Sequence, residues 1–258
     1  MRVTRFDSHG PATRDRYSTN TIARLDGVET FAEVLGALAE FRPAHPTARL
    51  LCTLDDLSQC LYTSMHASMD DRLGDEEGYD ENDPVATHDA DNARVARTAA
   101  ALENRTLRVE WDSLAPKTFA DDTKVAAIVG ANRNLDGILD NSVLIERVPV
   151  SRDDLAIAGI PNGYFSDDWD IFHNHAIIER MAGHGYRHIG VGASFLAFDR
   201  PEPLPTAQVE GVIVDLTHLY GSADSSLWKE LASLLIEQNL LVIGYTEDFE
   251  ARIVQAER

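Results

Sequence analysis

Short apolar runs of the kind that form buried β-strands recur along the chain and alternate with amphipathic segments of helical period. This alternation constrains the fold strongly, because strands and helices that are interleaved in sequence pack as a sheet with helices on at least one face. The predicted strands cover residues 48–54, 107–111, 124–129, 142–150, 186–198, 211–219 and 239–245.

Helices are predicted from their start signals and their periods. Thr30 and Glu33 form a T-x-x-E capping box ahead of apolar residues at helical spacing. Further helices are expected after Asp55 or Asp56 and over residues 92–103, 151–159, 167–182 and 224–238. Ser151 and Asp154 are expected to cap the helix over 151–159, and Ser166 the helix over 167–182. The first ~28 residues have no clear period and are expected to be a loop or a frayed strand.

We therefore predict an α/β or α+β fold with a mixed β-sheet covered by helices and a C-terminal strand–helix–strand unit over residues 211–245. The sheet should be mixed because no helix is predicted between the strands in the region 186–219. The polar stretch from Ala115 to Asp122 divides the chain into an N-terminal half, 1–115, and a C-terminal half, 116–258. The alternative is one continuous domain.

Composition restricts the classes of partner. The chain has 43 acidic and 23 basic residues and a net charge of −20, so nucleic acid and anionic membranes are not expected to bind it. No run of about 18 apolar residues occurs, and no apolar stretch follows the N-terminal arginines, so we expect a cytoplasmic protein. Cys52 and Cys60 are then expected to be reduced thiols.

Residues 70–91 contain ten acidic residues and one basic residue, Arg72. We predict a solvated acidic loop here, because like charges repel one another and few apolar residues are present. One interpretation is a docking surface for a basic protein, as in an inhibitor or immunity-type protein. A calcium loop is a second interpretation, although the glycine of the EF-hand spacing is missing.

The segment from Ser166 to His188 carries the candidate catalytic residues. Successive helical residues rotate by about 100° around the helix axis. With Asp167 at zero, the angles of Asp168, His175 and Glu179 are about 100°, 80° and 120°. His173 falls near about 240° and points elsewhere. Apolar residues flank the stripe on both sides, so Asp168, His175 and Glu179 are expected to face a cleft.

An imidazole beside carboxylates can act as a general acid and base or can bind a divalent metal. We predict His175, Glu179 and Asp168 as catalytic residues, with His175 and Glu179 as metal ligands. Asp168 is one candidate for the third ligand. The other candidates for the third ligand lie near predicted strand or helix ends and are His184, His188, Asp215 and His218.

The sequence thus supports two function classes. The first is a hydrolase or lyase acting on a small molecule through His175 and Glu179, with or without a divalent metal as its cofactor. The second is an acidic protein that binds a basic protein and has no catalytic activity. A structural role is a third interpretation of the histidine and its acids, because inward polar side chains often form a hydrogen-bonded network that fixes a helix.

Overall fold

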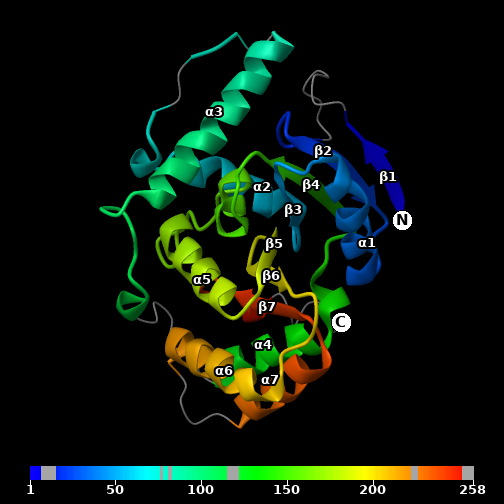
Figure 1. Ribbon diagram of the computed structural model, residues 1–258, viewed down its shortest axis with the longest axis vertical. Coiled ribbons are helices and arrows are strands. Elements are labelled where there is room, and N and C mark those ends of the chain that lie inside the picture. The colour runs from blue at the N-terminus through cyan, green and yellow to red at the C-terminus, as the bar shows by residue number, and fades with distance from the viewer. Residues whose placement is uncertain (7–15, 76–77, 81–82, 115–121, 222–225, 252–258) are drawn as a thin grey trace.

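The computed structural model describes residues 1–6, 16–75, 78–80, 83–114, 122–221 and 226–251. Within these residues the chain forms one seven-stranded sheet in the order β1-β2-β4-β3-β5-β6-β7 (Figure 1). The strands are β1 (Arg2–Arg5), β2 (Thr21–Asp26), β3 (Arg49–Thr53), β4 (Ser142–Val148), β5 (Arg187–Val191), β6 (Phe195–Asp199) and β7 (Leu240–Gly244). Strands β3 and β5 pair in parallel, and the other neighbouring pairs are antiparallel. The predicted mixed sheet is therefore confirmed.

Helices pack around this sheet, as the sequence predicts. They are α1 (Phe31–Phe41), α2 (Leu57–Ala67), α3 (Pro84–Glu103), α4 (Asp122–Arg133), α5 (Ile171–Gly183), α6 (Thr206–Tyr220) and α7 (Leu227–Glu237), with a 3₁₀ helix, η5 (Asp153–Gly159). Helix α5 packs against β5 and η5, while α4 packs against β7 and α7. Figure 1 shows α4, α6 and α7 together beside the β7 end of the sheet.

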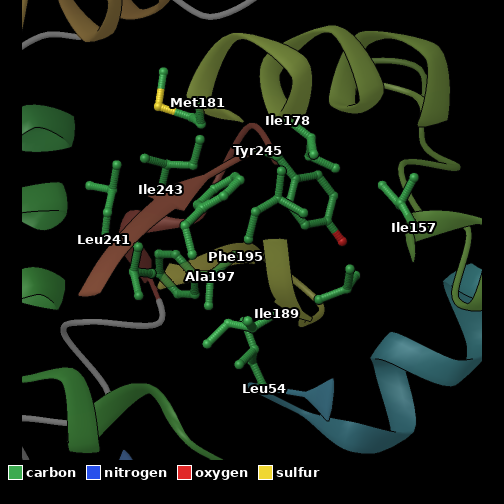
Figure 2. Close-up of a cluster of buried hydrophobic side chains, with 14 of the residues drawn as sticks. Leu54, Ile157, Ile178, Met181, Ile189, Phe195, Ala197, Leu241, Ile243 and Tyr245 are labelled. Carbon is green, nitrogen blue, oxygen red and sulfur yellow. The ribbon is translucent and has the colours of Figure 1, made fainter. Parts of the chain in front are cut away.

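The core between α5 and the sheet holds the candidate helix in place. Ile178 and Met181 of α5 are 1% and 0% exposed and belong to the buried hydrophobic cluster drawn in Figure 2. Leu196 and Ile243 on these strands are also fully buried. Burying such side chains stabilises the fold by about 1.5–3 kcal/mol each relative to leaving them exposed.

Two predicted strands are helices. Residues 124–129 lie in α4, and residues 211–219 lie in α6. The run in α4 is apolar because this helix packs against both β7 and α7. Helix α6 packs against α7 and buries Val212, Leu216 and Leu219, while Val214 is 59% exposed. The unit at the C-terminal end therefore runs from β6 through α6 and α7 to β7, and its two strands are antiparallel.

Four further segments differ from prediction. Residues 186–198 contain two strands, β5 and β6, joined by a tight turn, and residues 107–111 are not a strand. The acidic segment 70–91 is not a loop throughout, because Pro84 begins α3. In the N-terminal stretch, where a loop or a frayed strand was expected, β1 and β2 are regular strands. The predicted joint at 115–122 lies almost entirely outside the described residues.

The two halves of the chain contribute to the same sheet. Strand β4, from the C-terminal half, lies between β2 and β3, which are from the N-terminal half. The boundary at residue 115 stays a prediction. In the described part of the chain, no helix has both the length and the apolar character needed to span a membrane. Cys52 and Cys60 are buried free thiols, and burial raises the pKa of Cys52 to about 12.

Candidate functional site

Helix α5 begins later than the sequence predicts. Its N-cap is Asp170, whose carboxylate accepts hydrogen bonds from the backbone N–H groups of Phe172 and His173, each at 3.0 Å. Ser166 is therefore not the cap. Asp168 lies before the first turn, so its predicted place on the helical seam is wrong, because the rotation of about 100° per residue applies only inside the helix.

His175 and Glu179 do lie four residues apart on α5, where side chains at this spacing are neighbours. The His175 side chain is 6% exposed, and the Glu179 side chain is 27% exposed. This part of the predicted seam is as expected. The geometry leaves one edge of the pair open to solvent and the imidazole almost fully buried.

Asp154 supplies the third polar group, although its sequence context predicted only a helix cap. Its Oδ2 atom lies 3.1 Å from Nε2 of His175. The carboxylate comes from η5, which packs directly against α5. Potential ligand atoms of Asp154, His175 and Glu179 all lie within 4.8 Å of one another. These are one buried imidazole and two carboxylates from two elements of structure.

Two arginines neutralise this cluster. Arg152 donates hydrogen bonds to both oxygens of Asp154, with Nε 3.0 Å from Oδ1, and its Nη2 lies 3.7 Å from Glu179. Arg108 Nη2 lies 3.1 Å from the other oxygen of Glu179. Burial opposes the ionisation of Asp154, but hydrogen bonds from His175 and Arg152 outweigh it and hold the pKa of this carboxyl well below its usual range.

Asp168 lies in a different environment. The residue is 5% exposed and lines a cavity of about 650 Å³ together with His66, Arg72, Tyr164 and Phe165. It also lies near Tyr245: burial raises the pKa of this phenol well above its ordinary value, and the charge of Asp168 adds to that effect. The structure therefore groups His175 and Glu179 with Asp154 and places Asp168 in a cavity wall.

The other candidate ligands have partners of their own. Asp215 accepts two hydrogen bonds of 2.7 Å from Arg180, and its Oδ2 lies 2.6 Å from His184. His218 lies 3.3 Å from the carbonyl oxygen of Trp111. His188 is fully buried, and burial lowers its pKa to about 3, so it is neutral at pH 7. None of these four belongs to the group around His175 in the described part of the chain.

Comparisons of this chain with protein-family models, with curated proteins and with solved structures found no match.

Proposed function

We propose that this chain is a hydrolase or lyase that acts on a small molecule and uses a divalent metal ion held by Asp154, His175 and Glu179. The observation that carries the proposal is the placement of one imidazole nitrogen and two carboxylate oxygens within 4.8 Å of one another. Zinc, manganese and ferrous iron accept this set of nitrogen and oxygen ligands.

Charge balance supports replacement of the two arginine side chains by a divalent metal ion beside Asp154 and Glu179. Two guanidinium groups now offset the two carboxylates, and a divalent cation would carry the same charge as the two guanidinium groups together. Arg152 and Arg108 are 48% and 50% exposed in their side chains, so both can move toward solvent without losing a buried position.

The released arginines would then stand beside the metal. A metal ion at such a site polarises a carbonyl or phosphoryl oxygen and makes a bound water more acidic. Arg108 and Arg152 offer positive charge to an anionic oxygen on the substrate. The chain's own residues would therefore hold the ion and orient a small molecule with a negatively charged or polarised oxygen.

The test measures metal binding directly. Protein treated with a chelator is titrated with Zn²⁺ and Mn²⁺ in a calorimeter, and folding of each variant is checked by circular dichroism. His175→Ala and Glu179→Gln should weaken binding at least about 10-fold. The matched control is His184→Ala, because His184 also pairs with an aspartate but lies outside the cluster.

Arg152→Gln separates a metal site from a purely structural ion-pair network. Removal of the competing guanidinium should tighten metal binding while it destabilises the metal-free protein. If wild-type protein takes up neither metal, or if His175→Ala binds as well as wild type, the proposal is rejected. Hydrolysis of small esters and phosphoesters with and without the bound metal then identifies the reaction class.

A second candidate function is binding of a basic protein, and one surface feature favours it. Tyr62, Met65 and Met69 are 49%, 44% and 67% exposed and recur along one face of α2 and its C-terminal end. The exposed rings of Tyr164 and Phe165 adjoin them through His66, which contacts both Tyr62 and Tyr164. We call these five exposed residues the α2 ridge.

Acidic residues rim the α2 ridge, so we propose a basic partner with apolar anchors rather than a second copy of this acidic chain. Asp70, Asp71 and Asp75 follow α2 directly. The probe is a labelled amphipathic peptide of lysine and leucine, compared with a lysine and glycine peptide of equal charge. Tighter binding of the leucine peptide, lost in Met65→Ala and kept in the remote control Val214→Ala, supports docking. Equal binding of both peptides would reduce the interaction to charge alone.

A further inference from the structure

A second polar pocket, of about 410 Å³, lies apart from the cluster around His175. Its walls come from the turn before β2, from the end of α2 and from α3, and they include Tyr17, Ser18, Met69, Asp91 and Arg94. None of these residues belongs to the proposed metal site. The pocket combines a hydroxyl, an arginine and carboxylates, which is a set of groups with its own chemistry.

Ser18 is held in one orientation in this pocket. Its Oγ donates a hydrogen bond to Oε2 of Glu146 at 2.9 Å and accepts one from the backbone N–H of Asn20 at 3.0 Å. The turn itself is fixed, because the N–H groups of Tyr17 and Ser18 both donate to the hydroxyl of Thr21 at 3.0 Å. A serine hydroxyl directed at a carboxylate is the arrangement that general-base activation of a nucleophile requires.

Glu146 lies behind Ser18 and is buried, with 1% of its surface exposed. It stands in β4 opposite Thr21 of β2. Burial raises its pKa to about 7, although the hydroxyls of Thr21 and Ser18 and the charge of Arg94 partly oppose this shift. Its Oε1 atom makes no hydrogen bond within the described residues. A carboxylate with such a pKa accepts a proton at neutral pH more readily than an ordinary glutamate does.

Arg94 gives the pocket a positive charge with unused donor capacity. The residue is 9% exposed, lines the pocket, and has a buried Nη1 atom without a hydrogen-bond partner in the described part of the chain. Buried donors are usually satisfied, and an oxygen of a ligand bound in the pocket is one group that would pair with this guanidinium. Its guanidinium also lies 5.7 Å from the centre of the Tyr17 ring.

The charge of the walls restricts the ligand further. Four aspartates line the pocket with Arg94 as its single basic residue in the described part, and they are Asp70, Asp71, Asp75 and Asp91. A net negative wall favours a positively charged amine. A ligand with both an amine and a carbonyl oxygen would place the amine near the aspartates and the oxygen near Arg94.

We propose that Ser18 is the nucleophile of a second, metal-independent site that cleaves esters or amides bearing a positively charged amine. Glu146 takes the Ser18 proton as Oγ bonds to the carbonyl carbon, and Arg94 stabilises the negative charge that develops on the carbonyl oxygen. The bond from carbon to the leaving oxygen or nitrogen breaks, and Glu146 returns the proton to that leaving group. Water then cleaves the acyl–serine bond, which releases the acid and restores the hydroxyl.

A fluorophosphonate probe tests the nucleophile, because it forms a covalent adduct with activated serines. After incubation in the presence of a chelator, intact-mass and peptide mass spectrometry should find one adduct on Ser18, absent in Ser18→Ala. The matched control is Ser68→Ala, since Ser68 lines the same pocket but donates to the carbonyl of Met65 and has no carboxylate partner among the described residues. This variant should label like wild type.

Glu146→Gln should slow labelling about 100-fold, as loss of a general base does. Wild-type labelling should also rise as pH increases through about 7, which requires no variant and therefore remains informative if Glu146→Gln does not fold. No adduct, an adduct at Ser68, or a rate independent of both Glu146 and pH would overturn the proposal.

Substrate preference provides a separate readout. Glycine p-nitrophenyl ester should be cleaved faster than p-nitrophenyl acetate, after correction for the uncatalysed rates, and Asp71→Asn should reduce this preference. Because both assays contain a chelator, their failure would leave the metal proposal standing. Loss of labelling in His175→Ala would contradict the separation of the two sites.

Discussion

Nε2 of His175 in α5 lies 3.1 Å from Oδ2 of Asp154 in η5, and the two residues are 21 positions apart in the sequence. This contact fixes the rotational position of α5 relative to η5. It also brings the carboxylate of Asp154 to the imidazole, while Glu179 lies four residues after His175 on the same helix. The candidate site therefore depends on the packing of two elements, and a single helical seam would not form it.

Asp154→Asn should destabilise the protein at pH 6 by about 1.5–3 kcal/mol, which is typical of a lost hydrogen bond to a charged group. The folded state lowers the pKa of this carboxyl. Its contribution to the free energy of unfolding is therefore present above the pKa of the unfolded state and is lost as pH falls. The difference between wild type and variant should therefore shrink below about pH 4. Urea unfolding at pH 6 and pH 3 measures it. The neighbouring variant Asp153→Asn is the control and should cost less than Asp154→Asn at pH 6, because the Asp153 side chain is 42% exposed and pairs with Arg49 instead of His175.

Glu146 should give the opposite dependence on pH. Burial raises its pKa from 4.5 to about 7, so the folded state holds a proton that the unfolded state has released between these values. Stability then falls as pH rises through this window, by about 3 kcal/mol in total. Glu146→Gln should lack this loss. Urea unfolding of both proteins at pH 4.5 and pH 8 tests the difference.

The control for the Glu146 experiment is Glu110→Gln, because the Glu110 side chain is 78% exposed. It should follow the wild-type dependence at both pH values. If wild type and Glu146→Gln differ by the same amount at pH 4.5 and pH 8, Glu146 is not the group that titrates near neutrality.

Local signals in the sequence were sufficient for several elements. The capping box at Thr30 and Glu33 forms as predicted, with both reciprocal hydrogen bonds, and α1 follows it. The pair His175 and Glu179 was found because both residues lie inside α5, where the helical period holds. In each case the deciding interaction spans four residues or fewer, so the sequence contains it directly.

The run from Lys124 to Val129 shows where such signals fail. A helix buried by both a strand and another helix has no polar face, so its sequence resembles a buried strand. Val125, Ile128 and Val129 are all 0–1% exposed in α4. Only tertiary packing distinguishes the two structures.

The remaining site residues depend on contacts between distant segments. Asp154 meets His175 only because η5 packs on α5. Glu146 carried a usable signal, since it shares a strand face with Leu144 and Val148, which are 1% and 0% exposed. A glutamate on such a face is expected to be buried. Its partner Ser18 lies 128 positions away, and no local pattern indicates that contact.

Gly163 should be intolerant of alanine. Its φ of +88° is in the region that favours glycine, and a Cβ atom would lie 2.0 Å from the backbone oxygen of Trp169. Gly163→Ala should therefore cost at least about 2 kcal/mol in urea unfolding. Gly183→Ala is the matched control, because no described atom lies within 4 Å of its Cβ position. It should be neutral or stabilise α5 by up to about 1 kcal/mol. Equal effects of the two substitutions would contradict this account of the turn.

Asn132 should stabilise the edge strand β7. This residue of α4 is 1% exposed, and its amide pairs with both backbone groups of Val242 in β7: Nδ2 lies 2.7 Å from the carbonyl oxygen, and Oδ1 lies 2.9 Å from the nitrogen. Because β7 is the last strand of the sheet, Asn132 takes the place of a further strand. Asn132→Ala leaves two backbone groups unpaired and should lower the free energy of unfolding in urea by about 2–5 kcal/mol.

The control is the exposed neighbour Asn134→Ala, which should cost less than about 0.5 kcal/mol in the same urea unfolding experiment. Faster hydrogen exchange confined to β7 in Asn132→Ala would support the assignment, whereas wild-type protection of Val242 would contradict it.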